Sequence, residues 1–172
     1  MGCGPKAAAY PEEMATAHLL FGFLGAGKTT LAKELERRHD AVRFTPDEWM
    51  ARLFGEDPQA ELFDMKAATI LDLMEPLWLR CLGLGNDVVL DYGLWRRSER
   101  DHIRRLVQGC NARSLLYSVD CPEAVARRRV EERNREAHRS LFIAPETFDL
   151  LKLRFEPLQQ DESFQVGRPN DR

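Results

Sequence analysis

The stretch GFLGAGKTT, residues 22–30, decides the fold of this chain. It matches the phosphate-binding pattern G-x-x-x-x-G-K-[ST] without a substitution. The apolar residues 19–21 before it predict a short buried strand, and Leu31 and Leu35 after it share one face of a helix. Because strand, glycine-rich loop and helix are the context in which this pattern binds phosphate, we expect a phosphate-binding loop here.

The residue types of the loop suit a nucleoside triphosphate. Glycines let successive backbone N–H groups point into one concavity, and the following helix adds the positive end of its dipole. Lys28 is predicted to reach the β- and γ-phosphates, and the Thr29 hydroxyl to hold Mg²⁺. The alternative, a glycine-rich turn without a ligand, is disfavoured by the Lys-Thr pair. The residues predicted to bind the nucleotide in this loop are Gly22, Gly25, Ala26, Gly27, Lys28, Thr29 and Thr30.

Composition indicates one globular domain. A length of 172 residues with 44% hydrophobic content is enough to bury a core, and a net charge of −3 argues against general attraction to nucleic acid or anionic membranes. The four cysteines lie far apart, with no C-x-x-C pair and no matching histidine spacing, so we expect neither a metal site nor a redox site built on cysteine. With no long apolar run and no signal-peptide pattern, we expect a cytoplasmic protein.

The order of patterns predicts an α/β fold of three layers. Apolar runs near residues 19–21, 41–44, 87–91, 114–119 and 163–166 predict five strands, and helical patterns lie between them. Strands alternating with helices imply a parallel sheet with helices on both faces. We expect a flexible extension over residues 1–16, one domain over 17–167 with a lid near 134–145, and a tail over 168–172.

Two acidic residues follow predicted strands. Thr45, Pro46 and Glu48 have the spacing of a capping box that starts a helix, which places Asp47 just past the end of the second strand. Asp47 is either a proton acceptor for a substrate hydroxyl or an acid that favours the helix dipole. Asp91 ends the third strand, where a carboxylate orients the Mg²⁺ shell in nucleotide-binding proteins, although any strand can end in Asp.

The second half of the chain is rich in arginine, since 12 of the 20 arginines in the whole chain fall between residues 96 and 139. Arg96 and Arg100 follow the third strand, and Arg139 lies in the expected lid; all three are candidates for substrate binding. Arg129 and Arg133 lie one helical turn apart, a spacing that lets one guanidinium stack on a base while the next reaches phosphates. Solvated helix faces are the alternative for these arginines.

The chain resembles the small P-loop kinases, more narrowly the group of AAA-type proteins that contains zeta toxins, chloramphenicol phosphotransferases and polynucleotide kinases. The resemblance covers nearly everything after Thr16. It rests on the loop and on residues 45–49, 89–95, 129–134 and 142–157.

The resemblance implies residue roles. By this resemblance Asp47 is the general base, Arg129 stacks on adenine, and Arg133 steadies the transferred phosphoryl group. Members of the group phosphorylate antibiotics, sugar nucleotides or nucleic-acid ends, so the resemblance does not imply one acceptor.

The loop is also similar to that of CobW-type metallochaperone GTPases. Those proteins need a C-x-C-C cluster, a guanine-reading N-K-x-D sequence and a second domain. The sequence has neither motif and is too short for the second domain, which argues against this family.

These observations predict an ATP- and Mg²⁺-dependent phosphotransferase that acts on a hydroxyl of a small molecule. Lys28, Asp47 and Arg133 are the predicted catalytic residues, and Thr29 and Asp91 the predicted metal-binding residues. Two alternatives remain open: an ATP-binding switch or regulatory ATPase without an acceptor, and a polynucleotide 5′-hydroxyl kinase. The nucleotide and a hydroxyl-bearing molecule are the expected partners, with no membrane.

Overall fold

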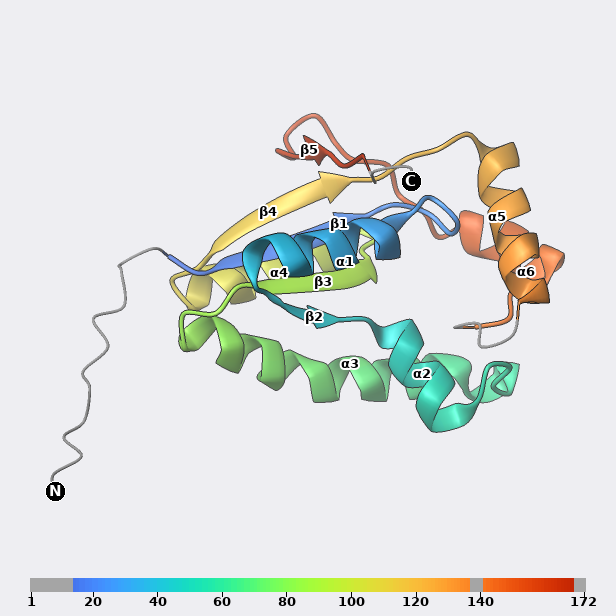
Figure 1. The fold of residues 1–172 in the computed structure, drawn as a ribbon, viewed down its shortest axis with the longest axis horizontal. Helices are drawn as coiled ribbons and strands as arrows, with labels where there is room; N and C mark the ends of the chain where they lie inside the picture. The colour runs from blue at the N-terminus through green and yellow to red at the C-terminus, as the bar shows by residue number, and fades with distance from the viewer. Residues whose placement is uncertain (1–13, 137–140, 169–172) are drawn as a thin grey trace, which may run out of the picture.

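A computed structural model describes residues 14–136 and 141–168 of the chain. In these residues a five-stranded parallel sheet has the strand order β2-β3-β1-β4-β5 (Figure 1). The strands are β1 (Thr16–Phe21), β2 (Val42–Phe44), β3 (Val88–Gly93), β4 (Arg113–Ser118) and β5 (Gln165–Val166). The predicted α/β fold with a five-stranded parallel sheet is confirmed.

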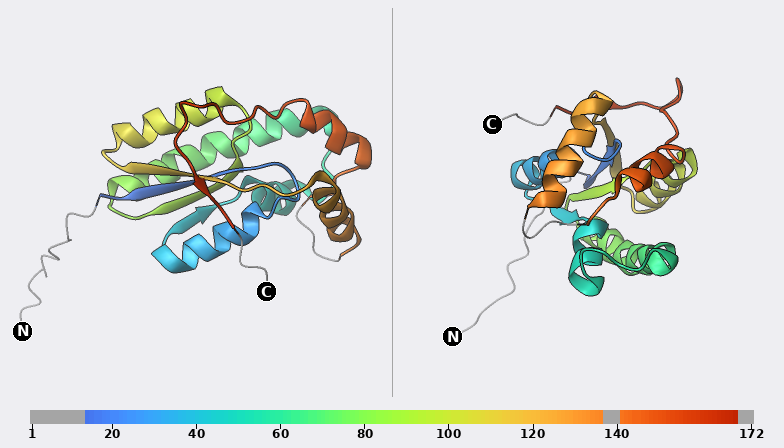
Figure 2. Two further views of the ribbon diagram at one scale, coloured as in Figure 1. Left: turned by 90° about the horizontal axis from the view of Figure 1, so that it is seen from above. Right: turned by 90° about the vertical axis from the view of Figure 1, so that its right-hand side faces the viewer.

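Helices cover both faces of this sheet, as Figure 2 shows. The helix α1 packs on one face, α3 and α4 pack on the other, and α5 and α6 lie beyond the carboxyl ends of the strands (Figures 1 and 2). The helices are α1 (Lys28–His39), α2 (Pro46–Phe54), α3 (Ala60–Gly83), α4 (Arg97–Gly109), α5 (Glu123–Arg135) and α6 (Pro145–Lys152). Within the described residues, no helix is long and apolar enough to cross a bilayer.

The central strand β1 shows why the layers form. Its side chains alternate: Leu20 packs in the cluster with α1, whereas Leu19 and Phe21 pack in the cluster with α3 and α4. All six residues of β1 are buried. Both faces of a parallel sheet are covered, so such a strand has an almost continuous apolar sequence.

The helices α3 and α2 each have one unusual local feature. The helix α3 continues unbroken through Pro76, with Ile70, Met74 and Trp78 buried along its length. Thr45 is the N-cap of α2 as predicted, but its side chain makes no capping bond. Glu48 instead pairs with Arg43, with 2.9 Å between Oε1 and Nη1, so the predicted capping box is wrong.

The start of the domain also differs by a few residues. Thr16 begins β1, and the buried Ala15 accepts a hydrogen bond from the Arg113 backbone N–H at 2.8 Å. Residues 15 and 16 are therefore part of the packed domain rather than of the predicted extension. Of the predicted lid, residues 137–140 lie outside the described residues, as do residues 1–13 and 169–172.

Candidate functional site

The loop between β1 and α1 requires glycine at several positions. Gly25 and Gly27 have φ angles of 72° and 105°, in the region that side chains disfavour. A Cβ atom on Gly22 would lie 2.3 Å from the Val119 carbonyl oxygen, and one on Gly25 would lie 2.4 Å from that of Ala126. The glycines therefore bring the loop against the backbone that leads into α5.

The helix that follows begins without a capping side chain. Gly27 is the N-cap residue of α1, and no side chain accepts a hydrogen bond from the first backbone N–H groups. Such groups, together with the helix dipole, favour a bound anion. The first turn of α1 and the loop thus have the form of a phosphate site.

Lys28 turns back over this loop. Its Nζ donates a hydrogen bond to the Phe23 carbonyl oxygen at 2.9 Å. Burial lowers the pKa of Lys28, while the negative charges of Asp91 and Asp47 oppose that shift. The ammonium and the two carboxylates therefore form one interacting group, drawn together from the loop, β3 and α2.

Asp91 and Thr29 form the pair expected of a magnesium site. The Thr29 side chain is hydrogen-bonded to the Asp91 carboxylate, and burial raises the pKa of Asp91 against the influence of Lys28 and Thr29. The Oδ2 atom of Asp91 is buried and has no hydrogen-bond partner. A hydroxyl and an unpartnered carboxylate oxygen are ligands that Mg²⁺ prefers, so the residues present fit that ion.

Asp47 lies in the first turn of α2 and lines the same cavity as the loop. Asp47 is exposed to solvent, but desolvation by the protein groups around its carboxyl raises the pKa, whereas the charges of Lys28 and Arg133 lower it. The helix start is fixed by Arg43, which donates to the Thr45 hydroxyl and to the Glu48 carboxylate. A raised carboxyl pKa beside two cations is typical of a general base.

The helix α5 brings two arginines to the loop. Arg129 and Arg133 both line the cavity. Arg129 Nη1 donates to the Gly25 carbonyl oxygen at 3.4 Å, while the Nε atom of Arg133 is buried without a hydrogen-bond partner. Since buried polar atoms are nearly always paired, the Arg133 guanidinium has hydrogen-bonding capacity left for a ligand.

The cavity has a volume of about 730 Å³. Its far wall is built from the connection between α2 and α3, the start of α3, the segment 141–143 and α6. Two contacts hold this wall together: Phe142 N–H donates to the Glu56 carbonyl oxygen at 2.8 Å, and the Asn134 side-chain amide donates to the Ile143 carbonyl oxygen at 2.7 Å. The wall residues include Asp57, Phe63, Asp64, Leu141, Leu150 and Arg154.

Three predicted substrate residues have other outcomes. Arg100 is fully buried, and its Nε and Nη2 atoms each lie 2.8 Å from a Glu162 carboxylate oxygen. It therefore holds the fold together rather than a substrate, which corrects the prediction. Arg96 is exposed and does not line the cavity, and Arg139 lies outside the described residues.

Sequence reasoning missed the role of Trp95 and of the far wall. Trp95 Nε1 donates to the Gly22 carbonyl oxygen at 2.9 Å, and its ring centroid lies 5.2 Å from that of Phe23. Trp95 thereby ties the segment after β3 to the phosphate loop. The position of Trp95 four residues after Asp91 could have indicated its role. The wall residues Asp57 and Asp64 lie in no motif that would have identified them.

Comparison with known families gives a result that agrees with this site. The model of the AAA domain family matches residues 18–158, which is most of the chain and includes every residue of the site described above. The chain belongs to the AAA domain family. Comparison with curated protein sequences finds no match.

Solved structures with the same fold include the following three. Kti12 from Chaetomium thermophilum, in complex with ADP-AlF3, is 17% identical, with a TM-score of 0.69 over 91% of this chain and 90% of that one. A sugar kinase from Janibacter sp. HTCC2649 is 20% identical, with a TM-score of 0.62 over 88% and 84%. A chain of the Pnkp1/Rnl/Hen1 RNA repair complex is 18% identical, with a TM-score of 0.69 over 86% of this chain and 46% of that one. The P-loop kinase-like fold is therefore confirmed.

Proposed function

We propose that this protein is an ATP- and Mg²⁺-dependent kinase that transfers the γ-phosphoryl group to a hydroxyl of a small molecule. One observation carries the proposal: Asp47, Lys28 and Arg133 line one cavity together with the phosphate loop. Kinases need a proton acceptor for the hydroxyl and cations for the phosphates, and this site offers both.

The proposed reaction follows from the residues. The acceptor hydroxyl oxygen attacks the γ-phosphorus, the bond from that phosphorus to the bridging oxygen breaks, and ADP leaves. Asp47 accepts the hydroxyl proton, while Lys28 and Arg133 donate hydrogen bonds to the phosphate oxygens. Thr29 and Asp91 would hold Mg²⁺, which supplies further neutralisation of phosphate charge when bound.

The far wall of the cavity favours a small acceptor over a nucleic-acid end. Among the described residues of this wall, Asp57 and Asp64 are acidic and Phe63 and Leu150 are apolar. Arg154 faces Asp64, with 3.6 Å between Nη1 and Oδ1, which offsets its charge. Nucleic-acid binding depends on cations that follow the phosphate backbone, and the described residues of this wall offer no such path.

The test is phosphoryl transfer from labelled ATP to panels of sugars, nucleosides, aminoglycosides and oligonucleotides with 5′-hydroxyls. We expect transfer to at least one small-molecule class, and a loss of about 10²–10⁴-fold in kcat for Asp47→Asn with ATP affinity retained. Asp72→Asn is the matched control, because that exposed carboxylate on α3 does not line the cavity.

Three results would contradict the proposal in different ways. An Asp47→Asn protein with wild-type turnover would remove the proposed base. Binding of ATP without transfer to any acceptor would favour a nucleotide-dependent switch. Transfer to oligonucleotide ends, with binding that weakens steeply as salt rises, would identify a polynucleotide kinase.

A further inference from the structure

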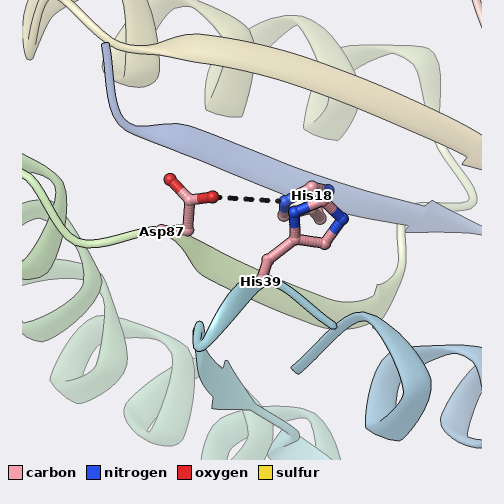
Figure 3. Close-up of side chains that lie close together, drawn as sticks. All are labelled: His18, His39 and Asp87. Atoms are coloured by element: carbon pink, nitrogen blue, oxygen red, sulfur yellow. Dashed lines mark ion pairs between the residues drawn. The ribbon is translucent and has the colours of Figure 1, made fainter. Parts of the chain in front are cut away.

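A second group of potential ligands lies far from the phosphate loop. His18 on β1, His39 at the end of α1 and Asp87 before β3 place their nitrogen and carboxylate atoms within 4.8 Å of one another (Figure 3). The 12-residue helix α1 separates His39 from the loop, which is about 18 Å at 1.5 Å per residue. This group is therefore distinct from the nucleotide site.

The two ring nitrogens of His18 have different surroundings, and these suit metal binding. His18 is 1% exposed, and its Nδ1 lies 3.1 Å from the Tyr117 hydroxyl. When Nδ1 carries the proton and donates to that hydroxyl, Nε2 presents a lone pair toward Asp87. Nε2 is buried and has no hydrogen-bond partner, and its distance to Asp87 Oδ2 is 3.7 Å. Fixing the tautomer through the other ring nitrogen is how proteins prepare metal-binding histidines.

The carboxylate is oriented in the same way. Asp87 Oδ1 accepts a hydrogen bond from the Thr16 backbone N–H at 2.7 Å, which leaves Oδ2 directed at His18 (Figure 3). At 3.7 Å, the separation of His18 Nε2 and Asp87 Oδ2 is too long for a hydrogen bond, so this contact leaves Nε2 available to a ligand.

We propose that His18, His39 and Asp87 bind a Zn²⁺ ion. Two imidazoles and one carboxylate are a common set of protein ligands for zinc, with water in the fourth position. Tetrahedral zinc with bonds of about 2.0–2.1 Å separates its ligand atoms by about 3.4 Å, close to the 3.7 Å found between His18 Nε2 and Asp87 Oδ2. Exposed His39 and half-buried Asp87 provide the path of entry.

The ligand types of the cluster select the kind of ion, since it offers two imidazoles and only one carboxylate. Mg²⁺ and Ca²⁺ rely on several oxygen ligands, whereas imidazole nitrogen favours zinc and similar transition metals. No sequence motif marks this cluster, because His18 and His39 are 21 residues apart and Asp87 follows 48 residues later.

A bound ion would join the starts of β1 and β3 to the end of α1. These three elements carry the phosphate loop and Asp91, so the proposed ion would stabilise the part of the fold that positions the nucleotide site. An ion that binds the folded chain at a hundred times its Kd is expected to raise the melting temperature by about 5–10 °C.

The test uses the full chain without an affinity tag, stripped with chelator and free of nucleotide, titrated with ZnCl₂ by calorimetry and followed by thermal unfolding. We expect one strong site per chain. His39→Ala and Asp87→Asn should each weaken it at least about tenfold, and Tyr117→Phe about 10–100-fold, because the partner of His18 Nδ1 is lost. In His39→Ala the zinc-dependent rise in melting temperature should disappear.

Two variants guard against other sites. His102→Ala removes an exposed histidine that faces Glu75 on the α3–α4 side, and it should bind zinc as the wild type does. Asp91→Asn removes the expected magnesium ligand and should also leave the zinc site intact. The proposal is overturned if the wild type takes up no zinc, or if His39→Ala binds it with unchanged affinity. Loss of the strong site in Asp91→Asn would likewise overturn it and place the ion at the phosphate loop.

Discussion

Arg100 and Arg133 both turn inward from helices near the carboxyl edge of the sheet, yet their surroundings are opposite. The Arg100 guanidinium donates to both oxygens of Glu162 and to the Leu94 and Trp95 carbonyl oxygens. The Arg133 guanidinium keeps a buried Nε atom without a partner and faces the cavity. An arginine with all its donors used stabilises the fold, whereas one with capacity left serves a ligand.

The acid partner of Arg100 supports its structural role. Burial alone would raise the pKa of Glu162, but hydrogen bonds from Arg100, from the Gln159 backbone and from Arg104 lower it to about 2. Its ionised form is therefore stabilised in the folded chain. The C-terminal segment is attached to α4 through this pair, and it returns from there to form β5.

The largest expected effect is at Arg133. Arg133→Ala should lower kcat for phosphoryl transfer by about 10³-fold or more, because arginines that stabilise the transferred group contribute that much. Its free energy of unfolding should stay near the wild-type value. Arg128→Ala, on the same helix but outside the cavity, is the control and should keep its activity. Equal loss in both variants, measured by steady-state kinetics, would show that α5 acts only as a scaffold.

Arg100 should give the reverse pattern. Arg100→Met leaves the Glu162 carboxylate buried without its main partner, so we expect a loss of about 3–5 kcal/mol in the free energy of unfolding. Urea unfolding measures this loss, with Arg105→Ala on the exposed side of α4 as the control. Because the folded-state pKa of Glu162 is depressed, its contribution is present above pH 4.5 and is lost toward pH 2. An unchanged stability in Arg100→Met would refute the structural role of Arg100.

The sequence predicted the phosphate site better than its surroundings because that site is local. Residues 22–30 carry the loop, the lysine and the threonine in one continuous stretch. The strand before them belongs to a parallel sheet, so the loop follows directly from the carboxyl end of that strand. Asp47 and Asp91 could be identified as candidates because one comes just after a predicted strand and the other ends one. The carboxyl ends of parallel strands meet at one edge of the sheet, so the prediction of a parallel sheet was enough to bring them together.

Arg100 could not be assigned from the sequence, because its partner lies 62 residues away in a segment with no regular pattern. A charged residue in an amphipathic helix is usually solvated, and no local pattern marks the exception. The far wall of the cavity was missed for the same reason: a backbone hydrogen bond joins the α2–α3 connection to Phe142, far along the chain. Contacts of this kind depend on how the layers close.

A smaller effect is expected in the pH dependence of the reaction. The pKa of Asp47 is raised by desolvation, and the positive charges of Lys28 and Arg133 oppose the rise. Since the proposed base must be ionised, kcat/KM should fall about tenfold per pH unit on the acid side, at a higher pH than an ordinary carboxyl would give. In Arg133→Ala the acid limb should move to still higher pH, because one opposing charge is gone. If the acid limb of the pH profile does not move in Arg133→Ala, Asp47 is not the group whose ionisation limits the reaction.

The smallest effect should come from Trp95, which belongs to both regions. Its ring packs on Phe23 and its Nε1 holds the Gly22 carbonyl oxygen, while its own carbonyl oxygen accepts from Arg100. Trp95→Phe keeps a ring but removes the N–H donor, at a cost of about 0.5–1.5 kcal/mol for one hydrogen bond. Because that bond positions the phosphate loop, the cost should appear as up to about tenfold weaker ATP binding in calorimetry. If stability fell instead and ATP binding did not change, Trp95 would belong with Arg100 rather than with the nucleotide site.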